Sequence, residues 1–520
     1  MPDRPRYRPD PGIACPDPTS VERALLVTFA CHALAMLTMA WLLLPMMPGG
    51  STADDATRVA AIAAHPWRWR MGWLPWGLTA ASDAALGIAL VRWGRVSRGA
   101  AWVALGLTCA AIVPDQAAQL LWVTRGVALA QGPDVGAYLS FERQIFPLTA
   151  AWAALFYTAG GVAWCACFAS AGAWSRRLTR LSIALYGLFA LAALAPLLPP
   201  SASLPRWTVG AANAAGFVGL EAWLFLVLER VVRIARPDTE HGRYAPWRAP
   251  RGSRGAALLD AMANGRALRR LLGLLPVPEF LSDIRDVVYV SYLVPAERLA
   301  SFVPAGLELQ RLGPARAWAM FTFLTYRHGH FGPRVAGPLR RLFSSPVQTN
   351  WRTYVRDPRT GREGIYFVTT AVTTRLHALG GRLMSEAPMH LLAVGEVTRE
   401  AGGRVRVRVD PGGGSGPDAE LDLAPASSFQ LLPPWASCFA DARAMLAYCV
   451  PQDRAMTTQP WRACTTREEI ALGIPLDACE PLVGTVRSRA AEAIVGDAAP
   501  LCFHVARVAF RLRGEVHDRW

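Results

Sequence analysis

The sequence predicts a multi-domain protein in which an all-α polytopic membrane bundle of six helices precedes a mainly antiparallel β-barrel of the α+β class. Three observations predict this. A chain of 520 residues is too long for one compact core. Its first half contains six apolar runs, each close to the ~20 residues that cross a bilayer as a helix. From about residue 283, apolar residues recur with the period of two that is typical of strands.

The six apolar runs define a transmembrane domain at residues 1–230. They lie near residues 24–44, 72–91, 100–122, 147–170, 179–198 and 208–228. Arginines are frequent in the N-terminal tail and in the loops at 92–98, 172–180 and 230–254, and sparse in the alternate loops. Because cytoplasmic loops carry the excess of positive charge, both termini are expected to be cytoplasmic. The alternative for the first run, a signal peptide cleaved near residues 51–53, fits its length less well.

The net charge of +15 does not indicate a nucleic-acid partner. Residues 1–278 hold 26 arginines and 15 acidic residues, whereas residues 279–520 hold 28 and 24. The excess therefore lies between the hydrophobic runs, so the lipid bilayer is the expected partner. All 54 basic residues are arginine. A chain without lysine cannot form a lysine Schiff base.

Three carboxylates, Asp83, Asp115 and Glu221, fall within the predicted spans. Ionisable groups at such depth are costly and often mark a pathway for protons or ions. The alternative, which we favour, is hydrogen bonding between helices, with Gln116 and Gln119 beside Asp115. No arginine or histidine motif completes a pathway around them.

Residues 231–279 are expected to form a basic linker that contains an amphipathic helix. Its leucines recur at helical spacing from Leu258 to Leu275, with arginines on other faces. Such a helix lies in the membrane interface or packs on the following domain. Prolines at 276 and 278 end it.

Residues 280–520 are expected to form the cytoplasmic barrel. Predicted strands cover residues 285–294, 315–326, 350–355, 363–373, 390–400, 403–410 and 502–514, and short helices cover 295–304, 374–384 and 440–450. The stretch "NWRTYV" places Asn350, Arg352 and Tyr354 on one face of its strand, because successive side chains alternate. Facing inward, they would form a polar ligand wall, with Trp351, Thr353 and Val355 pointing outward.

Arg352 is the central residue of that row. Its planar guanidinium suits a carboxylate or phosphate, while Asn350 and Tyr354 would orient the ligand. The alternatives are an exposed face or an internal ion pair with Glu386 or Glu396, because a buried arginine without a partner is costly.

Other motifs give little support for metal or hydrolytic chemistry. His328 and His330 could share one face of a strand, but no third ligand accompanies them. Lone His377 and His390 are typical of structural histidines. The glycine-rich "GGGSG" lacks the lysine and setting of a phosphate loop. We therefore expect no metal and no cofactor.

Several stretches of the second half resemble a known family. These are "VPAERLASFVPAGLEL", "NWRTYV", "EGIYF", "FADAR" and "QPWRAC". They are similar to an uncharacterised bacterial domain family grouped with acetoacetate decarboxylase, over residues 283–515. The resemblance implies an antiparallel barrel around a central pocket, in a bacterial protein whose spans would lie in the cytoplasmic membrane. It also implies that Arg443, which matches the arginine of the family's helix, lines the same cavity.

The chain also departs from that family. Gln348 stands where the family usually has an acidic residue, which puts an acid–base role there in doubt. The missing lysine excludes decarboxylation through a Schiff base. The six-helix half lies outside the resemblance.

These observations predict a membrane protein whose cytoplasmic barrel binds a small anionic or carbonyl ligand. Two alternatives remain open: a lysine-independent lyase or hydratase acting on a small carboxylate, and a transporter or channel that uses the intramembrane carboxylates.

Overall fold

The computed structural model describes residues 18–47, 54–198, 206–235, 246–450, 453–459 and 464–519. The chain divides into two compact units, Met1–Arg236 and Pro237–Trp520, which are described separately. The N-terminal arginines, the candidate cleavage site at 51–53 and residues 460–463 of "QPWRAC" lie outside the described residues.

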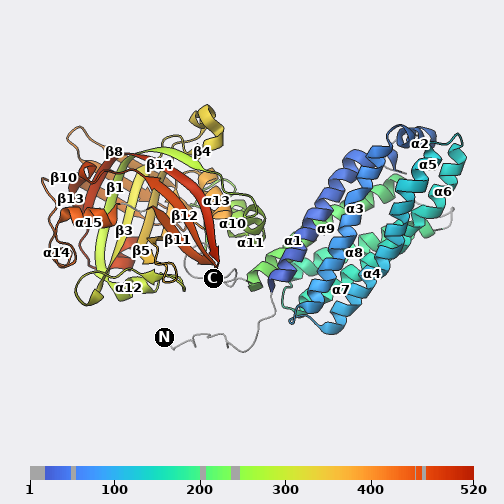
Figure 1. The fold of residues 1–520 in the computed structure, drawn as a ribbon, viewed down its shortest axis with the longest axis horizontal. Coiled ribbons are helices and arrows are strands. Elements are labelled where there is room, and N and C mark those ends of the chain that lie inside the picture. The colour runs from blue at the N-terminus through green and yellow to red at the C-terminus, as the bar shows by residue number, and fades with distance from the viewer. Residues whose placement is uncertain are drawn as a thin grey trace. The chain divides into compact units, whose positions relative to one another are not determined.

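The first unit is built from helices that run alongside one another (Figure 1). They are α1 (Pro18–Thr38), α2 (Asp55–Ala64), α3 (Pro66–Arg92), α4 (Arg98–Leu121), α5 (Val127–Ala130), α6 (Val135–Pro147), α7 (Ala154–Ser170), α8 (Arg176–Leu194) and α9 (Arg206–Ala235). Six continuous segments in the described part of this unit are long and apolar enough to cross a membrane: Ser20–Met46, Pro66–Arg92, Arg98–Ala130, Val135–Ser170, Arg176–Leu197 and Gly210–Ile234. The six predicted apolar helices are thus confirmed in number and in position along the chain.

Aromatic packing and one buried ion pair hold one end of the bundle together. Trp69, Trp73 and Trp122 pack on each other with ring centroids 5.8–6.3 Å apart. Nearby, Arg58 of α2 donates two hydrogen bonds to the Glu142 carboxylate of α6, at 3.1 and 2.8 Å. Large apolar side chains point away from the bundle instead, as lipid-facing residues do.

The second unit contains one large sheet, mostly antiparallel. Its strands are β1 (Phe280–Pro295), β2 (Glu308–Leu309), β3 (Trp318–Arg327), β4 (Gly332–Pro333), β5 (Val347–Arg356), β6 (Glu363–Val372), β7 (Met389–Leu391), β8 (Val394–Arg399), β9 (Val405–Asp410), β10 (Ala419–Pro425), β11 (Arg454–Gln459), β12 (Cys464–Leu472), β13 (Glu480–Arg487) and β14 (Leu501–Arg519). All seven predicted strands are confirmed, and residues 390–400 contain two strands rather than one.

The sheet closes on itself, which confirms the predicted barrel. The order β1-β3-β5-β6-β11-β12-β14 returns to β1 through an antiparallel pairing of β1 with β14 (Figure 1). The closing contact between β6 and β11 is parallel and pairs Ala455 with Ile365. The long strand β14 also pairs with β13 and so continues into a second arm, β13-β10-β9-β8.

The second arm covers the outside of the barrel wall. A core that includes Val407 of β9 and Leu421 of β10 packs against Trp351 of β5 and Phe323 of β3. A separate core, with Tyr289, Tyr354 and Phe503, packs inside the barrel. Trp351, Thr353 and Val355, which were expected to point outward, are all fully buried. The second arm and loops cover the outer face of β5.

Short helices complete this unit. They are α10 (Ala256–Asn264), α11 (Arg266–Leu272), α12 (Ala296–Ala300), α13 (Arg375–Met384), α14 (Trp435–Cys438), α15 (Ala442–Cys449) and α16 (Arg489–Val495). The predicted linker helix is broken at Gly265, where Asn264 hydrogen bonds to the backbone of Trp247. Leu259 and Ala263 of α10 pack in a small core with Ala378 of α13, so this helix packs on the following domain.

Candidate functional site

A cavity lies inside the barrel, next to the predicted polar row. It contains about 410 Å³ that no protein atom fills, part of it open to solvent. Its polar lining is contributed by Tyr289 of β1, Tyr326 of β3, and Asn350 and Arg352 of β5. These strands are consecutive in the ring, so the polar groups gather on one wall.

Arg352 is a buried cation without a carboxylate partner among the described residues. Its side chain is 3% exposed. Nη2 donates to the carbonyl oxygen of Cys449 at 3.1 Å, and Nε has no hydrogen-bond partner in the described part of the chain. The guanidinium carbon lies 5.7 Å from the ring centre of Tyr289 and 5.9 Å from that of Tyr354. Neither Glu386 nor Glu396 pairs with it, so the internal ion pair considered above is not formed.

The groups around Arg352 compensate its charge only in part. Cys449 is the last residue of α15, whose terminal carbonyls lack partners within the helix and carry partial negative charge. The faces of the two tyrosine rings add a weak attraction for the cation. A buried guanidinium normally requires a full counter-charge. Among the described residues, the charge of Arg352 therefore lacks a full counter-charge.

A chain of hydrogen bonds runs behind the polar wall. His328 Nδ1 lies 2.8 Å from Ser282 Oγ, and its Nε2 lies 2.9 Å from Gln348 Oε1. Gln348 Nε2 donates to Asn350 Oδ1 at 2.7 Å, and Asn350 Nδ2 donates to the Tyr326 hydroxyl at 2.9 Å. In this arrangement each amide accepts on its His328 side or from its neighbour and donates toward Tyr326. The chain thus fixes the amide of Asn350.

The direction of this chain determines what Tyr326 presents to the cavity. Gln348 Oε1 accepts, so His328 carries its proton on Nε2 and accepts from Ser282 at Nδ1. Burial lowers the pKa of His328 to about 3, which keeps the ring neutral. The Tyr326 oxygen accepts from Asn350, so its own proton remains available to a ligand in the cavity it lines.

The phenols of the site are neutral. Burial raises the pKa of Tyr289, Tyr326 and Tyr354 above the range of an ordinary phenol. The wall therefore offers one permanent positive charge and neutral donors. This favours an anionic or carbonyl oxygen over a cation.

The other predicted members of the site lie elsewhere. Tyr354 does not line the cavity, and its hydroxyl donates to the Cys449 carbonyl at 3.2 Å, beside Arg352 Nη2. Tyr354 therefore contacts the same carbonyl oxygen as Arg352 and does not face the cavity. Arg443 is exposed on α15, where Nη1 lies 3.0 Å from the Asp477 carboxylate. The expectation that Arg443 lines the cavity is not met, because its side chain points to solvent.

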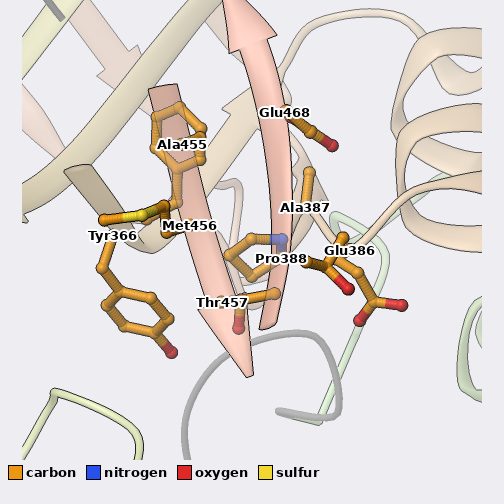
Figure 2. A pocket seen from close by; sticks show the side chains of 10 residues that line it. Tyr366, Glu386, Ala387, Pro388, Ala455, Met456, Thr457 and Glu468 are labelled. Atoms are coloured by element: carbon orange, nitrogen blue, oxygen red, sulfur yellow. The ribbon is translucent and has the colours of Figure 1, made fainter. Parts of the chain in front are cut away.

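A second cavity lies beside the seam between β6 and β11. Figure 2 shows Tyr366 and Met456 on one part of its lining and Glu386 and Glu468 on another. Phe367 lines both cavities. Two carboxylates thus line this second cavity, whereas a guanidinium lines the Arg352 cavity.

The described residues contain no group of three or more His, Cys, Asp or Glu side chains that could hold a metal ion. Both ring nitrogens of His328 already bind Ser282 and Gln348. His330 is exposed and takes a left-handed backbone conformation with φ 49°. The two histidines therefore do not form the candidate metal pair.

The three intramembrane carboxylates differ in their surroundings. Asp115 Oδ2 accepts from Gln116 and Gln119 at 3.0 Å each, and from the Tyr157 hydroxyl at 3.4 Å. Asp83 Oδ2 lies 3.8 Å from His32 Nε2. Asp83 Oδ1 and both oxygens of Glu221 are buried without a hydrogen-bond partner in the described part of the chain.

Sequence reasoning missed Tyr289 and Tyr326, and it noted His328 and Gln348 without their hydrogen-bonding roles. Gln348 and Tyr326 were detectable in part. Gln348 lies two residues before Asn350, so alternation places it on the same face of β5 as Asn350 and Arg352. Tyr326 lies opposite Gln348 in the pairing of β3 with β5. That register is a long-range property, which a single sequence does not reveal.

The fold and the cavity define a class of protein: a bundle with six helices long and apolar enough to span a membrane, joined to a closed barrel whose internal cavity is lined by a guanidinium. Residues 282–436 match the family DUF2071, described as an uncharacterised conserved protein. The predicted resemblance is thus confirmed over residues 282–436. No curated protein matches the chain.

Solved structures with similarity to this chain include enzymes of the acetoacetate decarboxylase type. The decarboxylase from Legionella pneumophila is 11% identical with a TM-score of 0.34, covering 46% of this chain and 87% of that one. The enduracididine biosynthesis enzyme MppR, complexed with pyruvate, is 16% identical with a TM-score of 0.33 and coverages of 47% and 91%. An acetoacetate decarboxylase-like enzyme from Sphingomonas wittichii is 12% identical with a TM-score of 0.33 and coverages of 48% and 96%.

Proposed function

We propose that this protein holds a ligand-binding barrel at the cytoplasmic face of a membrane, and that the barrel binds a small molecule through a carboxylate or carbonyl oxygen at Arg352. The observation that carries the proposal is the buried guanidinium with an unpartnered Nε beside a cavity. Asn350 is held by its neighbours, and Tyr326 offers a donor on the same wall.

The absence of lysine separates this site from Schiff-base chemistry. Binding without turnover describes a sensor, whereas turnover describes a lysine-independent lyase or hydratase. Both functions require the anion site, so binding is tested first and product formation second.

The test is calorimetric titration of the purified full-length protein in detergent with pyruvate, which carries both a carboxylate and a carbonyl group. Arg352→Met, which removes the charge at similar length, is the main variant. Arg443→Met is the matched control, because that arginine is exposed and away from the cavity. We expect binding in the wild type and in Arg443→Met, and loss in Arg352→Met. Equal binding by Arg352→Met would refute the site.

The bundle supports a second candidate function, proton or ion passage. The unpartnered Asp83 oxygen beside His32 is the observation that favours it, because an ionisable group in a membrane interior is often functional. Flux into proteoliposomes that contain a trapped pH indicator would detect it. Asp83→Asn should abolish that flux while leaving pyruvate binding intact. Flux unchanged by Asp115→Asn and by Asp83→Asn would exclude this pathway.

A further inference from the structure

The barrel cavity has two chemically different walls. Ten of its fourteen described lining residues are Ile, Leu, Val or Phe, and four are polar. The polar four lie on the consecutive strands β1, β3 and β5. The strands β12 and β14 contribute only apolar side chains, Ile470, Leu472, Val508 and Phe510, and Ile474 follows β12.

A small polar anion would use only one of these walls. Pyruvate or acetate at Arg352 would leave the side chains of β12 and β14 facing water, and apolar surface gains free energy only when it is covered. A ligand with an apolar chain would cover it. Its head group would still replace water at Arg352, Asn350 and Tyr326.

We propose that the ligand is an amphiphilic monocarboxylate, with its carboxylate at Arg352 and an alkyl or acyl chain lying against Val508, Phe510 and Leu472. This inference rests on the proposed anion site at Arg352 and adds the class of ligand. The carboxylate accepts from the Arg352 guanidinium and from the Tyr326 hydroxyl. The chain determines affinity through the area that it buries.

The proposal makes a quantitative statement about chain length. A fully buried methylene group strengthens binding by about fourfold. Affinity should therefore rise stepwise from acetate to hexanoate by roughly threefold to fourfold per methylene, and level off once the cavity is full.

The experiment titrates the full-length protein in detergent with acetate, butanoate, hexanoate and octanoate. Hexan-1-ol and hexylamine test the head group. Arg352→Met corrects for partition into micelles, because it leaves the micelle unchanged. Val508→Phe narrows the apolar side, and its acetate binding reports whether the site is still folded. We expect affinity to rise with chain length, no binding by the amine, loss of all acids in Arg352→Met, and a much larger loss for octanoate than for acetate in Val508→Phe.

The possible failures are distinguishable. If acetate and hexanoate bind equally and both depend on Arg352, the amphiphilic ligand is refuted while the anion site stands. If hexan-1-ol binds as well as hexanoate and Arg352→Met changes neither, the anion site is refuted. If no acid binds to the folded protein, both proposals fall.

Discussion

At the scale of single residues, we expect opposite effects on stability when each of two buried arginines is replaced by methionine. Arg58 pairs with Glu142, so Arg58→Met leaves a buried carboxylate unpaired and should destabilise the bundle by about 3 kcal/mol or more. Arg352 has no carboxylate partner among the described residues, and the Cys449 carbonyl that it contacts also accepts from Tyr354. Arg352→Met should therefore leave the stability of the barrel unchanged or increase it.

Urea unfolding of the full-length protein, followed by alkylation of buried cysteines, measures both effects. Cys167 reports on the bundle and Cys502 on the barrel, since both are buried. A large loss of barrel stability in Arg352→Met would mean that this arginine is a structural element rather than a ligand-binding group.

Tyr326 is expected to act through its single free proton. Tyr326→Phe removes a donor to a charged acceptor, a hydrogen bond that contributes about 1.5–3 kcal/mol, so ligand affinity should fall by at least tenfold. Tyr366→Phe is the matched control, because that phenol lies in the acidic second cavity. Calorimetry with pyruvate or hexanoate compares them. Equal effects of the two substitutions would contradict the assigned hydrogen-bond direction.

His328 makes the barrel sensitive to acid. Burial lowers the pKa of His328 to about 3 in the folded protein, whereas an unfolded histidine titrates near ~6.5. The unfolded state therefore binds the proton first as the pH falls. The contribution of neutral His328 to the free energy of unfolding should be fully present above pH ~6.5. Below that pH it should decline toward pH 3, by about 1.4 kcal/mol per pH unit.

The pH dependence of urea unfolding, read from Cys502 alkylation, tests this prediction. In His328→Gln, one proton fewer should bind on unfolding, so the free energy of unfolding should depend less steeply on pH. His390, whose pKa burial also lowers to about 3, contributes in the same direction, so a residual slope is expected. A slope that His328→Gln leaves unaltered would show that the ring does not stay neutral on folding.

At the scale of elements, β5 is buried on both faces, whereas alternation alone predicts one ligand face and one outer face. Trp351 stacks on Phe323 with ring centroids 4.6 Å apart and is fully buried. Trp351→Ala should therefore cost about 3–5 kcal/mol of barrel stability. Trp102, which is 61% exposed on α4, is the control and should tolerate alanine. The same alkylation assay measures both, and a small effect at Trp351 would mean that the second arm packs loosely on the barrel.

Element types were predictable where the chain is strongly periodic. The six apolar runs and the seven strands were found because each carries its own periodicity. Strands β10, β11, β12 and β13 were not predicted. In β12, the stretch Cys464–Leu472 contains polar residues on both faces, so no alternation marks it. Pairing with β11 and β14 makes it a strand.

At the scale of the whole molecule, the distribution of arginine predicts that the barrel is cytoplasmic. Protease added to right-side-out vesicles should leave the barrel intact, and protease added to inside-out vesicles should degrade it. Degradation in right-side-out vesicles would reverse the proposed orientation and place the Arg352 cavity outside the cell. An antibody against a C-terminal tag provides the readout.

The sequence by itself determined the membrane helices, the period of the strands, the absence of lysine chemistry and the row that contains Asn350 and Arg352. Each of these is a local property of composition or spacing. Only the tertiary structure decided which groups meet that row. Tyr289, Tyr326, Ser282 and His328 reach it through strand pairing, and Cys449 reaches it from the end of α15. The apolar wall of β12 and β14 faces Arg352 because the sheet closes into a ring. Register and closure join residues far apart in the chain, and no local pattern encodes them.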